Sequence, residues 1–203
     1  GATPLALDVT DADAIAALPA RLAADMGAPL DWLVNNAGAA DSAPLAKSDD
    51  ELYCRLMEIN FHGARRLAGA FLPGMVERDH GRVVSVASSA GLVGSPYVTA
   101  YCASKHALVG YTRAAAAELA RTDVGVAAVC PHYVDTPLLR RSVDNVVAKT
   151  GKSQDEALAF FAEQNPGGRL VQPEEVAAAV LELCLGDGRG LVELDGGPAR
   201  QVP

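Results

Sequence analysis

The chain has 203 residues, half of them hydrophobic and 5% aromatic, which suits a single domain with one proper hydrophobic core. Its formal net charge is −8 at pH 7 and its Lys and Arg residues form no long run, which argues against nucleic-acid or anionic-membrane partners. The four cysteines lie far apart without a CxxC pattern, which predicts free thiols and a reducing, cytoplasmic setting. No apolar run is long enough to span a bilayer.

Short apolar runs alternate with helix-periodic runs along the chain. Short apolar runs predict buried strands, whereas apolar residues spaced three and four apart predict helices. In chain order, we expect strands over 3–7, 30–34, 82–86, 126–130 and 191–194. Between them we expect helices over 13–26, from 48 through Asn60 to 78, over 101–121, within the polar segment 138–164, and over 173–185. Strands that alternate with helices indicate βαβ units, so the sequence predicts an α/β fold with a parallel sheet.

Two local patterns mark helix beginnings. Ser48 and Glu51 have the spacing of a capping box, which predicts that the long helix begins after Ser48. Pro173 suits the first turn of the last helix, because a proline there lacks only an N–H group that the helix leaves unpaired.

The side chains that indicate a chemistry are Ser88, Tyr101 and Lys105. On a helix, residues four apart share one face, so the Tyr101 hydroxyl and the Lys105 ammonium can enter the same pocket. A free phenol has a pKa near 10, and a neighbouring cation favours the phenolate and lowers that pKa. The Ser88 hydroxyl can then hold a carbonyl oxygen while Tyr101 delivers a proton. A lone Tyr-x-x-x-Lys pattern also occurs on half-exposed helices without a function, so the neighbouring motifs decide its meaning.

Those motifs run in order along essentially the whole chain: LDVTD at 7–11, NNAG at 35–38, Asn60, SSAG at 88–91, YCASK at 101–105, PHYVDTP at 131–137 and LDGG at 194–197. Together they resemble the classical short-chain dehydrogenase/reductase family, and are similar to its 3-hydroxyacyl and 3-oxoacyl reductase members. The resemblance implies a Rossmann-like doubly wound parallel sheet forming one NAD(P)-binding domain over 1–203. Within it, 138–169 would be a mobile lid over the substrate.

The resemblance also implies roles for single residues. Tyr101 would be the general acid in reduction and the base in oxidation, and Ser88, rather than Ser89, would polarise the substrate carbonyl. Lys105 would hold the nicotinamide ribose and lower the pKa of Tyr101, and Asn60 would support a water that links Lys105 to solvent. Each also has a plainer interpretation: Asn60 as a helix kink and Ser88 as a cap at a strand end.

The implied cofactor is NAD or NADP, bound where the strands end. Besides Tyr101 and Lys105, the residues that follow three of the strands would contact it. Asp8 and Val9 would lie at the adenine, and Asn36, Ala37 and Gly38 at the adenosine ribose and the middle of the dinucleotide. Pro131, Val134 and Thr136 would lie at the nicotinamide carboxamide. Asp8 is also a common turn residue. The histidines have no metal-ligand spacing, so we expect no metal.

The sequence departs from the family in three places. These 203 residues lack the family's glycine-rich phosphate turn and the β-α-β segment that flanks it. In the family, the second strand of that segment chooses between NAD and NADP. Without it, the expected strand over 3–7 would have no neighbour and the strand over 30–34 would have an open edge. We therefore expect that Gly1 is not the biological start. His132 replaces a customary glycine, and 187–190 replaces a TGQ-like turn.

The sequence thus predicts an NAD(P)-dependent oxidoreductase interconverting a secondary alcohol and a ketone. The 3-hydroxybutyrate enzymes of the family carry Gln and His where this chain has Ala39 and Ala90, which favours a 3-oxoacyl thioester or a bulkier ketone. The alternative is a truncated, cofactor-less binding or scaffold protein. Family members assemble through two long helices, here 51–78 and 101–121, which implies a homotetramer or, failing that, a dimer.

Overall fold

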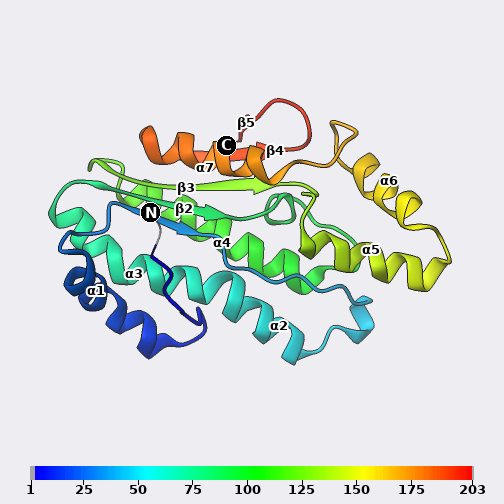
Figure 1. The fold of residues 1–203 in the computed structure, drawn as a ribbon, viewed down its shortest axis with the longest axis horizontal. Coiled ribbons are helices and arrows are strands. Elements are labelled where there is room, and N and C mark those ends of the chain that lie inside the picture. Colours follow the sequence, from blue (N-terminus) through cyan, green and yellow to red (C-terminus); the bar gives the residue numbers. More distant parts are fainter. Residues whose placement is uncertain (1–2, 203) are drawn as a thin grey trace.

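The computed structural model describes residues 3–202, in which five strands form one sheet between layers of helices (Figure 1). The strands lie in the order β1 (Trp32–Asn35), β2 (Gly81–Val86), β3 (Val124–Pro131), β4 (Gly190–Leu194) and β5 (Arg200–Val202). The first four are parallel, and β5 pairs antiparallel with β4. The predicted α/β fold is confirmed. β5 was not predicted, because its three residues are too short to give a periodic pattern.

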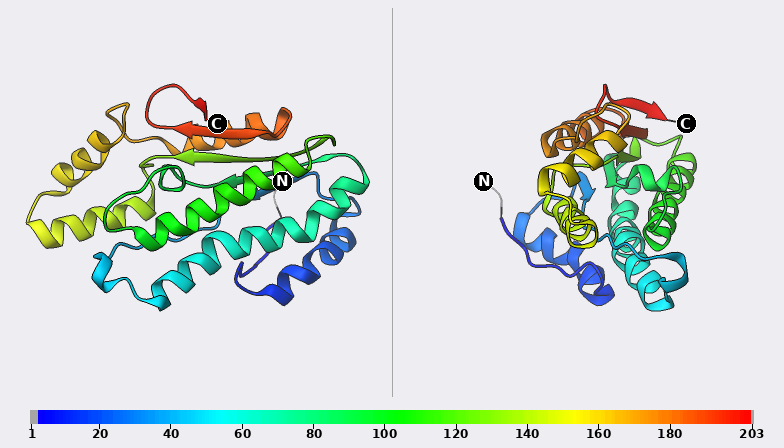
Figure 2. Two further views of the ribbon diagram at one scale, coloured as in Figure 1. Left: turned by 180° about the vertical axis from the view of Figure 1, so that it is seen from behind. Right: turned by 90° about the vertical axis from the view of Figure 1, so that its right-hand side faces the viewer.

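Helices cover both faces of the sheet because its central strands are buried on both sides. In β2, Val83 packs toward α3 (Gly63–Glu77), while the next residue, Val84, packs toward α7 (Pro173–Leu185). Successive side chains of a strand point to opposite faces, so a continuous valine run serves two cores. Figure 2 shows α3 beside α4 (Thr99–Glu118) on one face and α7 on the other, the arrangement of a doubly wound sheet.

The expected strand over 3–7 is absent. This segment has no regular secondary structure, although Leu5, Leu7 and Val9 pack against the core beneath α3. A strand needs a partner for its N–H and C=O groups, and here the apolar side chains find the core while the backbone finds no neighbouring strand. The outer edge of β1 is likewise open and leaves Trp32 and Val34 more than 40% exposed.

The first helix, α1 (Ala12–Met26), lies near its predicted position. The Asp11 side chain caps its start by accepting from two backbone N–H groups, and Gly27 ends it in the left-handed conformation. The expected lid is a pair of helices, α5 (Pro137–Thr150) and α6 (Gln154–Gln164). Short 3-10 turns, η1 (Leu45–Lys47) and η3 (Ser89–Gly91), lie in the loops after β1 and β2.

The predicted long helix is continuous but contains one wide turn. It comprises α2 (Asp50–Met57), a π-helical turn η2 (Glu58–His62), and α3. Its N-cap is Asp49, whose side chain accepts from Leu52 N–H, so the predicted capping by Ser48 is wrong by one residue. Asn60 lies inside the π turn, a feature that often marks functional sites.

No helix among the described residues combines the length and apolar character that crossing a bilayer requires.

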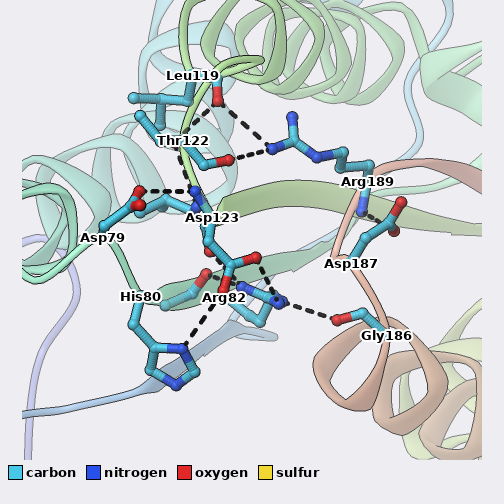
Figure 3. A network of polar contacts seen from close by, with 11 residues as sticks. Asp79, His80, Arg82, Leu119, Thr122, Asp123, Gly186, Asp187 and Arg189 are labelled. Carbon is cyan, nitrogen blue, oxygen red and sulfur yellow. Dashed lines mark hydrogen bonds and ion pairs between the residues drawn. The ribbon is translucent and has the colours of Figure 1, made fainter.

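A polar network fastens the end of the sheet where β2 and β3 begin (Figure 3). Arg82, 9% exposed, donates to the carbonyl oxygens of Gly81, Asp123 and Gly186 and contacts the Asp123 carboxylate at 3.4 Å. Arg189 donates to Thr122 O at 2.6 Å. One buried guanidinium thereby joins the first residue of β2, the residue before β3 and the end of α7.

Replacing Arg82 by Met should lower the free energy of unfolding by about 2–3 kcal/mol, because buried carbonyl oxygens lose their donor. Urea unfolding with an unchanged m-value measures this loss. The matched control is Arg21→Met, which removes an exposed arginine paired with Asp25 at 3.9 Å and should cost less than about 0.5 kcal/mol. Equal costs for the two variants would contradict the structural role of Arg82.

Candidate active site

The residues singled out in the sequence lie where the parallel strands end. Asn36, Ala37 and Gly38 follow β1, Ser88 follows β2, and the 131–136 segment lies at the end of β3. In a doubly wound sheet the carboxyl ends of the strands border the ligand crevice. The first two turns of α4 carry Tyr101 and Lys105 to the same edge.

The structure places the Ser88 side chain near enough to the Tyr101 hydroxyl to lower the pKa of that phenol. The Ser88 hydroxyl also accepts from Ala90 N–H at 3.1 Å, so it caps the turn η3 as well as meeting Tyr101. Burial raises the pKa of Tyr101, and Ser88 offsets only part of that rise. The expected lowering of this pKa by Lys105 is therefore wrong for the protein alone: Tyr101 remains a neutral phenol at physiological pH.

Lys105 is a buried amine near, but not bonded to, the Tyr101 hydroxyl. Its ammonium donates to Val86 O at 2.9 Å and lies 5.8 Å from the centre of the Tyr101 ring. Burial lowers its pKa to about 8. An ammonium has three N–H donors, so a buried lysine with one protein acceptor has donors left for a hydroxylated ligand.

Asn60 joins the loop after β1 to α4. Its side chain, 1% exposed, accepts from Ala39 N–H at 2.8 Å, donates to Ala39 O at 2.9 Å, and donates to Ser104 Oγ at 3.0 Å. Ser104 in turn donates to Tyr101 O at 2.8 Å. The Asn60 amide is thus occupied by protein groups and acts as a positioning group, which differs from the simple helix kink considered above.

The loop after β1 approaches these residues closely. A Cβ atom built on Gly38 would lie 3.2 Å from Asn60 Oδ1 and 3.7 Å from Lys105 Nζ. A larger residue would press into the space between them, which accounts for the glycine. Asn36 and Ala37 line a cavity of about 250 Å³ together with Val9, which joins three of the predicted cofactor residues at one place.

Asp8 is placed differently. It is exposed, and its carboxylate accepts from the N–H and the hydroxyl of Thr10, both at 2.8 Å. These bonds lower its pKa. The geometry is that of an Asx turn, so the plainer interpretation as a turn residue describes Asp8 in this structure.

The predicted nicotinamide segment begins at the end of β3. Pro131 is the last residue of that strand, Val134 forms an isolated parallel bridge with Val171, and Thr136 caps α5. We call residues 132–136 the nicotinamide loop. His132 Nε2 lies 2.8 Å from Glu193 Oε1, so the residue that replaces the family's glycine ties this loop to β4.

Sequence reasoning missed two residues near the site. Tyr133 raises the pKa of Tyr101, so it lies within electrostatic range of the Tyr101 hydroxyl. Asn165 bonds the backbone of Tyr133. Asn165 precedes Pro166 and two glycines, a pattern that indicates a turn, and nothing in the sequence places it beside a residue 32 positions away.

The comparisons with known proteins agree with this geometry. The family model for short chain dehydrogenase matches residues 1–146. A Streptomyces coelicolor protein with the provisional name of ketoacyl reductase is 40% identical over 187 residues, covering 91% of this chain and 71% of that protein. A D-beta-hydroxybutyrate dehydrogenase of Cupriavidus necator is 38% identical over 154 residues, covering 75% of this chain and 60% of that enzyme.

A similar solved structure is a crystal structure of a variant of actinorhodin polyketide ketoreductase with NADPH, with a TM-score of 0.85 at 37% identity. The match covers 94% of this chain and 75% of that chain. The chain therefore belongs to the short-chain dehydrogenase family, whose members are NAD(P)-dependent oxidoreductases that act on alcohols and ketones.

Proposed function

We propose that this protein reduces a 3-oxoacyl thioester or another bulky ketone, with Ser88, Tyr101 and Lys105 as its catalytic residues. The observation that carries the proposal is that Tyr101, the buried Ser88 and the buried amine of Lys105 gather at one place, with Lys105 Nζ 5.8 Å from the centre of the Tyr101 ring. Two hydroxyl groups and one amine at the edge of the sheet are suited to polarising a carbonyl and protonating its oxygen.

The residues present fit the nicotinamide side of the cofactor. Gly38 leaves space between Asn60 and Lys105, and Lys105 has donors for ribose hydroxyls. Val9, Asn36 and Ala37, which are expected to meet the adenosine half, line one cavity. When bound, NAD(P)H supplies a hydride to the carbonyl carbon of the substrate. The glycine turn that holds the pyrophosphate in the family does not occur in these 203 residues.

The remaining half of the reaction belongs to the protein. Ser88 Oγ–H donates to the substrate carbonyl oxygen and draws electron density away from the carbonyl carbon. As the carbonyl carbon gains the hydride, the Tyr101 hydroxyl gives its proton to the same oxygen and the product is a secondary alcohol. Burial raises the pKa of Tyr101, so the phenol holds this proton at neutral pH, as the step requires.

The rim of the site supports a large, apolar substrate. Large apolar side chains that are each more than a third exposed follow the ends of β2 and β3: Val93, Tyr97, Tyr133 and Leu138. The two positions that distinguish the 3-hydroxybutyrate enzymes are Ala39 and Ala90, whose side chains offer no polar group to a free carboxylate. A thioester has no such carboxylate to neutralise, and its acyl chain gains from apolar contact.

Tyr101→Phe should lower kcat for reduction of an acetoacetyl thioester by about 10²–10⁴-fold, because it removes the proton donor and keeps the ring. Cofactor affinity, followed by quenching of NADH or NADPH fluorescence, should change by less than about threefold. Tyr111→Phe, on the same helix, is the matched control and should keep normal turnover. Near-normal turnover in Tyr101→Phe would refute its role.

The same assay tests the substrate and the alternative function. Free acetoacetate should have a kcat/KM at least about tenfold below that of its thioester. A difference of this size is what an enzyme achieves when two substrates differ in a single group, here a carboxylate in place of a thioester. Equal values would overturn the substrate class. A protein that quenches neither NADH nor NADPH fluorescence and reduces neither compound would instead support the cofactor-less scaffold.

Burial of Lys105 predicts a pH-dependent cost in stability. Its pKa is about 8 when folded and near the ordinary 10.5 when unfolded, so between these values only the unfolded state holds the proton. The free energy of unfolding of the wild type therefore rises with pH across this window, relative to a variant without the amine. The shift corresponds to about 3 kcal/mol.

Lys105→Met should accordingly be more stable than the wild type at pH 7 by up to about 3 kcal/mol, and the difference should vanish toward pH 10.5. Urea unfolding between pH 6.5 and 10 measures it. Lys47→Met removes an exposed amine and serves as the control, with a small difference at every pH. A Lys105→Met difference that stays constant with pH would contradict the burial of a charged amine.

A further inference from the structure

Asn165 is a buried polar residue outside the catalytic set. It is the C-cap residue of α6, the second helix of the lid, and is 1% exposed. Burying an amide costs free energy unless its hydrogen bonds are replaced inside the protein. Its partners therefore indicate what the side chain does.

Those partners are main-chain groups of two other segments. Asn165 Oδ1 accepts from Tyr133 N–H at 3.0 Å, and Asn165 Nδ2 donates to Tyr133 O at 2.9 Å and to Arg169 O at 2.7 Å. One amide side chain thus pairs with both main-chain groups of a single residue, as an opposing residue in an antiparallel sheet does. An apolar side chain could fill the same volume but would leave the Tyr133 N–H without this acceptor.

The surrounding backbone continues the same attachment. Val171 N–H donates to Tyr133 O at 3.0 Å, and Asp135 N–H donates to Val171 O at 2.9 Å. Gly167 N–H donates to Asp195 O at 2.9 Å, and a Cβ on Gly167 would lie 2.3 Å from the carbonyl carbon of Gly196. The segment that leaves α6 is therefore held between the nicotinamide loop and the end of β4, with Asn165 at its start.

Tyr133 connects this attachment to the reacting groups. Its ring packs against Phe161 of α6, with centroids 4.9 Å apart and planes inclined by 56°. Tyr133 also follows the end of β3, at the same edge of the sheet to which α4 brings Tyr101. Fixing the Tyr133 peptide on both sides therefore fixes a ring that packs against the lid at this edge.

We propose that Asn165 is a positioning residue that couples the lid helix α6 to the nicotinamide loop by holding the main chain of Tyr133. The proposal rests on the function proposed above, because the loop matters to catalysis only if it borders the reacting carbonyl. The Asn165 amide fixes where the lid ends relative to Tyr101, and a displacement of about 1 Å at such a point can cost two orders of magnitude in rate.

The test replaces Asn165 by Leu, which keeps the volume and removes the amide. Backbone amide exchange in residues 132–136 should speed up by at least about tenfold, while β2 keeps wild-type protection. The kcat for thioester reduction should fall by about 10–100-fold with a smaller change in KM. Gln164→Leu, one residue earlier and exposed, is the matched control and should change neither measurement.

Wild-type exchange in 132–136, or faster exchange spread evenly over the whole chain, would overturn the proposal, and so would an unchanged kcat. If Asn165→Leu does not fold, Asn165→Asp decides by the same two measurements. It keeps the acceptor for Tyr133 N–H but turns an oxygen toward two carbonyl groups, so exchange and kcat should shift in the same directions by at least about threefold. A wild-type protein that reduces no ketone refutes the proposed function. Backbone amide exchange at Tyr133 in the Asn165 variants still tests whether the Asn165 side chain holds the main chain of Tyr133.

Discussion

The arrangement of this site depends on one buried amide, that of Asn60. Its two hydrogen bonds to Ala39 hold the loop after β1, and its third reaches Ser104 on the helix that carries Tyr101 and Lys105. The loop and the helix come from distant parts of the chain and share no strand pairing. A fully bonded amide at their junction sets their relative position more sharply than apolar contact would, because a displaced partner leaves a buried polar group unpaired.

The cost of the site lies in desolvation. Burial lowers the pKa of Lys105 and raises that of Tyr101, so a neutral phenol and an amine whose charged form is disfavoured lie near each other. Both shifts disfavour the charged forms. At the opposite end of the strands, Arg82 satisfies three carbonyl oxygens with one guanidinium. The buried polar site and the Arg82 network thus lie at opposite ends of the strands, which matches the general pattern of a polar site supported by a rigid scaffold.

The sequence predicts the regular parts of this fold well because their signals are local. The valine run of β2 and the periodicity of α4 need no knowledge of the rest of the chain. Asn60 also belongs to a recognisable motif set, but its bonds to Ala39 follow from a π turn that no spacing rule reveals. Long-range polar partners such as Asn165 lie beyond local patterns altogether, since a residue in an Asn-Pro-Gly-Gly segment looks like a turn.

The error over 3–7 has a different cause. The segment is apolar enough to read as a strand, and Leu5 and Leu7 are partly buried against the core. A strand also requires a neighbouring backbone, which side-chain pattern does not report. The pKa of Tyr101 shows that spacing has a similar limit. The spacing to Lys105 places the two residues on one helix face, yet burial raises the pKa of Tyr101, and the group that opposes this rise is Ser88 rather than Lys105.

Asn60 and Ser104 form one connection that places α4 against the loop after β1. Its effect on catalysis is measured by kcat/KM for thioester reduction in Asn60→Leu, Ser104→Ala and the double variant. We expect a fall of about 10–100-fold for Asn60→Leu and no further fall in the double variant, because both substitutions break the same connection. Losses that simply multiply, or an Asn60→Leu variant with wild-type kcat/KM, would show that the two residues do not act together in this way.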